Sequence, residues 1–391
     1  MSFHTKQIQS QKLAIIDIGS YKIRVAICTI KNGDIQLIWY AEKRQDNRHT
    51  KSWEIIDLEW VCEDISIAVQ KAQEDADMTV EHIIIGTPFS ETYFSAKKIN
   101  YIRSFPERDI DTKELQEIVS TVQNKAIKTF MRDIEKSVAY KRSDLGLISS
   151  QISKIKMDSH VISELTWKKW SNVTLFLSNI FIPKHKSEVL KYIANYLDKE
   201  IIKIIPTEFA LAHLFEQDSD IVIVDIWNAH TSLIVKKAGN VLGIQKISIG
   251  MNDLIKDIAS KSDHTNNYII ENIDSAQFID MQQEFLAVFM SAISLTLEEI
   301  LGTKVCPHKI FLLWGWANQF LIDAFSGDNL RAHNIKIANN VEIIETKETY
   351  FGQMYSKSKA SIISMMIASK DIFADRNKPL AQALKQASKD I

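Results

Sequence analysis

The sequence predicts an α/β protein built from two lobes, and three observations support this prediction. The chain has 391 residues, more than one hydrophobic core usually serves. Apolar runs with strand character alternate with segments of helical periodicity along most of the chain. Two of the apolar runs end in a carboxylate followed by a polar turn, at Asp17 and at Asp225. We therefore expect two α/β lobes, each with a polar turn at the end of a core strand.

The first lobe begins with a meander of strands. Residues 13–30 have the pattern of two strands around a polar turn, and residues 34–42 have the pattern of a third. Residues 57–77 carry apolar side chains at helical spacing, and residues 82–85 form a short apolar run. This order of strands, helix and strand is typical of an α/β domain.

The pattern changes in the middle of the chain and later resumes. A long charged helix begins near Asp109 and is followed by short alternating strands, which indicates an inserted subdomain. A strand at 172–181 and a helix at 184–199 restore the first pattern. The second lobe then begins with an apolar strand at 220–224, after which two more α/β cycles follow.

Composition argues against several classes of protein. A net charge of -2 and a pI near 6.6 provide no basic face for broad nucleic-acid binding. Cys28, Cys62 and Cys306 are far apart and lack metal-ligand spacing, so we expect free thiols in a reducing compartment. The polar N-terminus argues against a secretory signal, and no stretch approaches the ~20 apolar residues of a spanning helix. We therefore expect a cytoplasmic protein.

The first candidate site is the segment 15–25, Ile-Ile-Asp-Ile-Gly-Ser-Tyr-Lys-Ile-Arg-Val. Its strand ends in Asp17, turns through Gly19 and Ser20, and returns with Lys22. Such a turn can direct backbone N–H groups at a phosphate, and its carboxylate can hold a metal ion through water. An ordinary hairpin with a polar turn is the alternative, and these residues alone leave both interpretations open.

This segment resembles the first phosphate hairpin of the actin-like ATPases, and Lys22 at that offset is similar to the cell-division family FtsA. The order of the following elements is similar to FtsA as well. It includes an inserted subdomain at the place of the FtsA-type SHS2 domain. The resemblance implies an α/β, two-lobed actin-like (ribonuclease H-like) fold with an FtsA-type inserted subdomain.

The resemblance also implies a division of the chain into subdomains. In chain order these are the N-terminal part of the first lobe (1–87), the inserted subdomain (88–171), the return of the first lobe (172–212), the second lobe (213–255), a small subdomain (256–306), the return of the second lobe (307–345), the closing helix of the first lobe (346–374) and a C-terminal tail (375–391).

Two further turns that the resemblance implies depart from the family pattern. Asp225 and Thr231 remain at the second hairpin, but Trp, Asn and Ala occupy 227–229, where the family carries glycines. At the third turn only Gly315 remains, flanked by two tryptophans that would either stack on adenine or fill an emptied pocket. Glycine lets a backbone approach a phosphate closely. The substitutions therefore predict weak or lost ATP binding.

If nucleotide binding is retained, the resemblance implies that Asp17 and Asp225 would face Mg²⁺ through water. ATP and Mg²⁺ are then the implied cofactors, and we assign no catalytic residue. We expect at most a slow ATPase, and favour a pseudo-ATPase. The implied nucleotide-binding residues are Asp17, Gly19, Ser20, Lys22, Asp225, Thr231 and Gly315.

Two other segments allow alternative interpretations. Trp167-Lys168-Lys169-Trp170 could be a knob that binds a partner, or a hairpin turn whose indoles pack back on the sheet. FtsA ends in a membrane-binding amphipathic helix, and Pro379 could start such a helix here. Its membrane-facing residues would be Leu380, Leu384 and Ile391; a frayed terminal helix is the alternative.

The resemblance implies a bacterial scaffold that polymerises and links FtsZ-type division filaments to the inner membrane. Its partners would be further copies of the chain, through a head-to-tail contact of the inserted subdomain, and FtsZ-like and membrane division proteins. It would lie on the cytoplasmic face of the membrane. The alternatives are a PilM-like adaptor that captures a peptide of a membrane partner in a pilus or other envelope complex, a competent actin-like ATPase, and a sugar-kinase relative.

Overall fold

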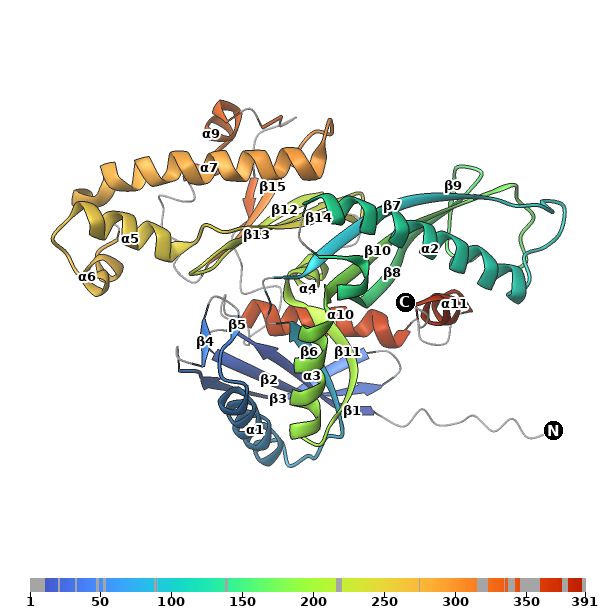
Figure 1. Ribbon diagram of the computed structural model, residues 1–391, viewed down its shortest axis with the longest axis horizontal. Coiled ribbons are helices and arrows are strands. Elements are labelled where there is room, and N and C mark those ends of the chain that lie inside the picture. Colours follow the sequence, from blue (N-terminus) through green and yellow to red (C-terminus); the bar gives the residue numbers. More distant parts are fainter. Residues whose placement is uncertain are drawn as a thin grey trace. The chain divides into compact units, whose positions relative to one another are not determined.

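The structure is a computed structural model of the chain. It describes residues 11–388 except for 20–21, 32–33, 47–48, 52–53, 88, 90, 138–139, 216–219, 274, 315–322, 334, 337–341, 345–358 and 375–378. The chain forms two compact units (Figure 1). Unit 1 comprises Met1–Ala210 with Ser361–Ile391, and unit 2 comprises Leu211–Ala360.

The first sheet of unit 1 has the strand order β11-β6-β1-β2-β3. Its first three strands in the chain form an antiparallel meander, and β6 and β11 extend the sheet in parallel. The strands are β1 (Gln11–Ile18), β2 (Lys22–Lys31), β3 (Asp34–Arg44), β6 (His82–Thr87) and β11 (Glu200–Pro206). A separate small hairpin consists of β4 (Thr50–Lys51) and β5 (Glu54–Ile55).

Three helices pack on this sheet. α1 (Leu58–Asp75) and α3 (Lys184–Tyr196) share one apolar core with it. α1 begins where the Asp57 side chain accepts a hydrogen bond from the Trp60 N–H, and its buried residues recur at helical spacing. α10 (Ala360–Ala374) also reaches the sheet, where Met365 contacts Gly86. The short α4 (Thr207–Leu211) follows β11 directly.

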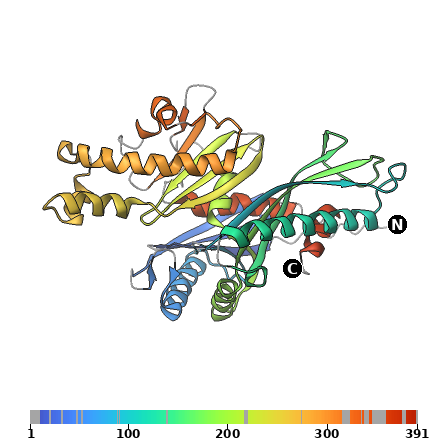
Figure 2. The same ribbon diagram turned by 45° about the horizontal axis from the view of Figure 1, so that its top comes forward.

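The inserted subdomain has its own four-stranded sheet, of order β7-β10-β8-β9, and α2 (Thr112–Ser137) lies along it (Figures 1 and 2). The apolar face of α2 covers the sheet and forms a separate core with it. The strands are β7 (Tyr93–Ile102), β8 (Leu145–Met157), β9 (His160–Ile162) and β10 (Asn172–Pro183). The expected change of pattern is a change of sheet, but the boundary expected at residue 171 was wrong. β10, expected to restore the first lobe, pairs along its length with β7 and β8, so the return to the first sheet begins with α3.

The C-terminal helix α11 (Pro379–Ala387) packs on α2 and β8. Leu384 is buried in the core of the inserted subdomain, and Leu380 packs against that core. Both residues therefore face protein in this structure rather than a membrane, because their stripe meets a complementary apolar surface within unit 1. Ile391 lies outside the described residues.

Unit 2 repeats the topology of the first sheet. Its strand order β14-β13-β12-β15-β16 again joins an antiparallel meander to two parallel strands. The strands are β12 (Ile221–Ile226), β13 (Thr231–Lys237), β14 (Asn240–Ile247), β15 (Lys309–Trp314) and β16 (Glu342–Ile344). The helices are α5 (Met251–Lys261), α6 (Asn266–Glu271), α7 (Ile279–Leu301) and α9 (Gly327–Ala332). Two units with one repeated sheet confirm the prediction of a two-lobed α/β fold.

Across the described parts of both units, no helix combines the length and the apolar character that crossing a membrane requires.

Candidate functional site

The structure places three of the predicted nucleotide residues, Asp17, Gly19 and Lys22, in the hairpin that joins β1 to β2. Asp17 lies directly opposite Arg24 in the antiparallel register. Arg24 Nη1 donates to Asp17 Oδ2 at 2.9 Å, and Ser361 Oγ on α10 donates to the same oxygen at 2.5 Å. Asp17, Arg24 and Ser361 are all buried. The carboxylate predicted to face Mg²⁺ is therefore neutralised by a cation of its own chain.

The turn itself is closed by contacts within unit 1. The Gly19 N–H donates to the Lys22 carbonyl at 3.0 Å, and Gln45 Nε2 donates to the Gly19 carbonyl at 2.5 Å. A Cβ at Gly19 would lie 2.8 Å from the Lys22 oxygen and 3.3 Å from Arg24 Nη1. Glycine is thus required here for the close approach of the chain to itself. Ser20 lies outside the described residues.

Lys22 is paired but remains accessible. Its Nζ lies 2.5 Å from Glu42 Oε1, and the Tyr40 hydroxyl donates to the other oxygen of that carboxylate at 3.0 Å. Burial would raise the pKa of Glu42, but the hydrogen bonds from Lys22 and Tyr40 outweigh it and hold the pKa below its ordinary value. Burial also raises the pKa of Tyr40. The charge of Lys22 is thus already paired with a carboxylate.

The second hairpin, between β12 and β13, holds Asp225 and Thr231. The indole N–H of Trp227 donates to Asp225 Oδ2 at 2.6 Å, and Asp225 is buried. Thr231 is fully buried, and its hydroxyl donates to the Ile249 carbonyl at 2.8 Å. Trp227 therefore covers the carboxylate, and Thr231 serves the packing of the turn.

The start of α5 closes the second turn from the other side. The N–H groups of Met251 and Asn252 donate to the carbonyls of Trp227 and Asn228 at 2.9 and 2.8 Å. A Cβ at Gly250 would lie only 2.4 Å from the Trp227 oxygen. Free N–H groups at a helix N-terminus can bind an anion. Here two of them already bind the carbonyls of the turn.

The third predicted turn is described only up to its strand. The parallel register sets Trp314 beside Ile226, so the ends of β15 and β12 are neighbours. Gly315 and the tryptophan after it lie outside the described residues. The choice between a stacked and a filling indole therefore stays a prediction.

Two hydroxyls that sequence reasoning did not single out lie at the carboxyl edge of the first sheet. Thr87 ends β6 opposite Pro206 of β11, and Thr207 begins α4. Both are buried, and their hydroxyls have no hydrogen-bond partner among the described residues. A water molecule or a ligand oxygen would satisfy them. The position of Thr87 after Gly86, at the end of an apolar strand, is the signal that could have found it.

Several groups that the resemblance assigns to Mg²⁺ and ATP are bound within the chain in this structure. The Oδ2 oxygen of each candidate carboxylate accepts hydrogen bonds from its own chain, and two N–H groups at the start of α5 are occupied. Within the described ranges, no group of three or more His, Cys, Asp or Glu residues could hold a metal ion. Arg24, Gln45 and Ser361, which close the first hairpin, were not predicted.

Neither known protein families nor curated protein sequences show a match to this chain. Among solved structures it is similar to the PilM-PilN type IV pilus biogenesis complex, with a TM-score of 0.59 and 12% identity over 92% of this chain and 97% of that one. It is also similar to the ethanolamine utilization protein EutJ from Carboxydothermus hydrogenoformans, with a TM-score of 0.43 and 9% identity over 86% of each chain. A third similarity is to the cytoplasmic domain of EpsL, an inner membrane component of the type II secretion system of Vibrio cholerae, with a TM-score of 0.41 and 6% identity over 91% of this chain and 95% of that one.

At these identities the similarity shows the fold and no more. Together with the repeated sheet topology, the likeness to the PilM-PilN structure shows an actin-like fold. The finer assignment to FtsA stays a prediction.

Proposed function

We propose that this chain is an actin-like adaptor that works without a nucleotide cycle. The observation that carries the proposal is the internal use of both candidate carboxylates, Asp17 by Arg24 and Asp225 by Trp227. A metal ion held through water needs carboxylate oxygens that can accept from that water. Breaking the Asp17–Arg24 pair would leave a buried charge uncompensated, which is costly.

The partners of such an adaptor would be proteins. A chain without a nucleotide cycle has no hydrolysis step to drive assembly, so binding equilibria with partners must control it. The fold is shared with a protein solved in a pilus biogenesis complex. We therefore infer a place in an envelope-associated assembly, with peptide capture from a membrane partner as the mode of binding.

Calorimetry tests the loss of the nucleotide cycle. The wild-type chain is titrated with ATP and Mg²⁺ up to millimolar nucleotide, beside an Asp17→Ala variant. We expect no heat of binding in either. Micromolar affinity in the wild type that disappears in the variant would show a working site and overturn the proposal.

The FtsA-like scaffold predicted from the sequence remains the second candidate, and Lys22 in the first hairpin together with the inserted subdomain favours it. It differs from the adaptor in one measurable property, because a head-to-tail contact generates open filaments. Sedimentation of the purified chain, alone and with FtsZ-type filaments, separates the two. An adaptor stays in the supernatant, whereas a scaffold forms pellets and binds the FtsZ-type filaments.

A further inference from the structure

The outer face of α1 exposes apolar side chains. The helix lies against the first sheet (Figures 1 and 2), and its inner face is buried in the core that it shares with that sheet. On the opposite face, Trp60 is 53% exposed and Ile67 is 45% exposed. Because Ile67 follows Trp60 by almost two helical turns, the two side chains lie on one line. We call this line the outer stripe, which consists of the exposed residues Trp60, Glu63, Ile67, Lys71 and Glu74.

Trp60 is held in place from the inner side of the stripe. Its indole stacks on the ring of His49, with the ring centroids 5.4 Å apart and the planes at 11°. His49 Nδ1 lies 3.5 Å from Asp64 Oδ2, and the His49 carbonyl accepts hydrogen bonds from the N–H groups of Ile56 and Asp57. The indole is therefore positioned before a partner binds, which reduces the entropy that binding would cost. Tryptophan is also among the residues that most often dominate the energy of an interface.

The charge around the outer stripe is negative. α1 contains five carboxylates and one lysine, Lys71. One carboxylate, Asp64, is buried and pairs with Lys43 at 3.1 Å. The other four are exposed and form no ion pair with the described residues: Glu59, Glu63, Glu74 and Asp75. At the end of the helix, Trp39 of β3 is 42% exposed and its indole N–H donates to Asp75 at 3.1 Å. α1 therefore offers an apolar line set among carboxylates.

This combination defines the chemistry of a partner. Nucleic acid and anionic lipids carry the same sign of charge as the stripe, so both are repelled. Two copies of the chain packed α1 against α1 would also bring like charges together. An amphipathic helix that carries lysine or arginine beside its apolar face matches the stripe in both respects, because its apolar side chains have the same helical spacing and its charges are opposite.

We propose that the outer stripe of α1 docks a basic amphipathic helix from the juxtamembrane segment of a membrane partner. The assignment to a membrane partner rests on the proposed function, in which the chain captures a peptide of such a protein. Segments beside spanning helices on the cytoplasmic side are enriched in lysine and arginine. The apolar side chains of the helix pack on Trp60 and Ile67, and its cations lie against Glu63 and Glu74. Burial of the indole supplies most of the affinity, and the exposed ion pairs supply selectivity and salt dependence.

Fluorescence anisotropy with the full chain tests the proposal. The probe is a labelled model peptide of leucine and lysine, with leucine at helical spacing so that one face is apolar. A scrambled peptide of the same composition carries the same charge without the apolar face, and we expect it to bind about tenfold more weakly. Trp60→Gln should weaken binding of the first peptide by about tenfold or more. Glu63→Gln/Glu74→Gln should weaken it by about fivefold at low ionic strength, and the difference should disappear in high salt.

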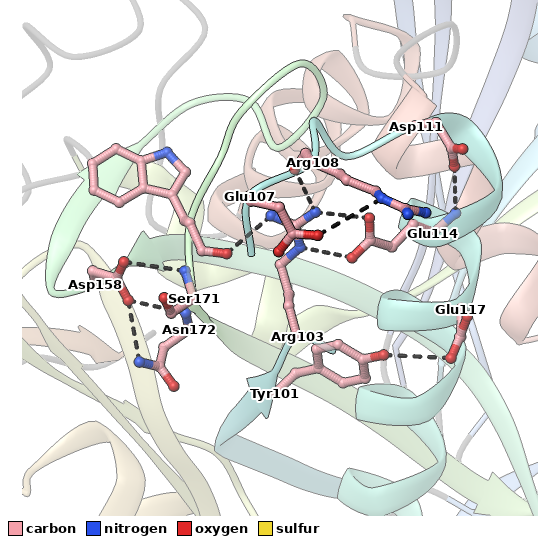
Figure 3. A network of polar contacts seen from close by, with 11 residues as sticks. Tyr101, Arg103, Glu107, Arg108, Asp111, Glu114, Glu117, Asp158, Ser171 and Asn172 are labelled. Atoms are coloured by element: carbon pink, nitrogen blue, oxygen red, sulfur yellow. Dashed lines mark hydrogen bonds and ion pairs between the residues drawn. The ribbon is translucent and has the colours of Figure 1, made fainter. Parts of the chain in front are cut away.

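An exposed indole elsewhere provides a matched control. In the segment Trp167 to Trp170, Trp170 packs against the core of the inserted subdomain, whereas Trp167 is 73% exposed and is followed by two lysines. Figure 3 shows the network beside it, in which Arg103 pairs with Glu114 at 2.6 and 2.8 Å and donates to the Trp170 carbonyl at 2.9 Å. Trp167 has φ of 59°, and asparagine tolerates this left-handed backbone. Trp167→Asn should therefore fold and bind the peptide as the wild type does.

A second control separates local charge from net charge. Glu298→Gln/Glu299→Gln removes the same two charges from the exposed side of α7. We expect this variant to bind the peptide as the wild type does, because neither glutamate belongs to the stripe. An equal loss in the α7 and α1 double variants would show attraction by net charge alone and overturn the inference.

Two further outcomes would overturn it. One is a wild-type chain that binds the two peptides equally or not at all. The other is unchanged binding in both α1 variants. The glutamine variants change only exposed side chains, so they keep the test valid if Trp60→Gln unfolds. Failure of the proposed function is seen separately, because a chain that binds ATP and still binds the peptide through α1 would lose the nucleotide-free adaptor and keep the docking site.

Discussion

The two candidate hairpins occupy the same place in two sheets of equal topology, yet they are closed in different ways. In unit 1 the buried carboxylate of Asp17 meets a cation, Arg24. In unit 2 the buried carboxylate of Asp225 meets a neutral donor, the Trp227 indole, and the backbone of the turn is bonded to α5. At the first hairpin, the negative charge of Asp17 is thus compensated by Arg24. At the second hairpin, the Trp227 indole lies against Asp225, and the start of α5 lies against the backbone of the turn.

This difference indicates how each turn could be changed. Side chains close the first hairpin, and its glycine is still present, so substitutions of single side chains act on charge alone. Backbone groups close the second hairpin, so a change there must move the turn or the helix start. The contribution to stability should therefore depend on electrostatics at the first hairpin and on packing at the second.

The largest effect is expected for Arg24→Met. The variant leaves the Asp17 carboxylate buried without its cation, and breaking one partner of a buried pair costs about 3–5 kcal/mol. Denaturant unfolding measured near neutral pH would show the loss as a lower midpoint. The double variant Asp17→Asn/Arg24→Met removes both charges and should recover most of it. A single variant as stable as the wild type would mean that the pair does not neutralise Asp17.

Next in size is Gly250→Ala. Its Cβ would approach the backbone oxygens of Trp227 and Asn228 to 2.4 and 2.6 Å, and overpacking of this kind costs about 1–3 kcal/mol. Gly146→Ala in β8 is the control, because its Cβ would meet no atom closer than 3.6 Å. Thermal unfolding of the two variants compares them directly. Equal melting temperatures would contradict the close packing of the turn on α5.

The sequence predicted the fold better than the site, and the reason is physical. Periodicity and caps are local, so the helix expected at 57–77 begins at Leu58 after its Asp57 cap. The partner of Asp17 could also have been predicted, because the register of an antiparallel hairpin sets Asp17 opposite Arg24. Ser361, which is 344 residues away, could not be predicted because only tertiary packing brings it to the same oxygen.

Side-chain direction limited the remaining predictions. The hydrogen bond from the Trp227 indole to Asp225 depends on a rotamer that no sequence pattern specifies. The stripe on α11 suits a membrane and a protein surface equally well, and Leu384 faces α2 because that surface lies within reach of the chain. The exposed Trp167 differs from the packed Trp170 through the backbone turn between them.

A smaller effect is expected for Trp227→Phe. The ring remains, but the buried Asp225 loses the indole donor, which costs about 1–2 kcal/mol. Trp39→Phe removes the same kind of donor from Asp75 at 3.1 Å, where the indole is 42% exposed and water replaces it. Denaturant midpoints should therefore fall for the first variant and stay nearly constant for the second. If Trp39→Phe lowered the denaturant midpoint more than Trp227→Phe, the hydrogen bond from Trp227 to Asp225 would not be the more stabilising of the two.

The smallest effect concerns Glu42→Gln, which tests whether Lys22 is held loosely. The pKa of Glu42 lies below its ordinary value of 4.5, so the carboxylate stabilises the fold above that pH. This stabilisation is lost as pH falls through the lowered pKa. Because the pair is partly exposed, we expect a loss of about 0.5 kcal/mol near neutral pH. Unfolding curves of the two chains should converge in acid.

If the loss at neutral pH instead matched that of Arg24→Met, Lys22 would be as firmly bound as Arg24. The first hairpin would then have no cation that could turn to a phosphate. A small loss that disappears in acid would mean that Lys22 can exchange the Glu42 carboxylate for another anion. Binding of an anion at the first hairpin would then be limited by the pair of Arg24 with Asp17.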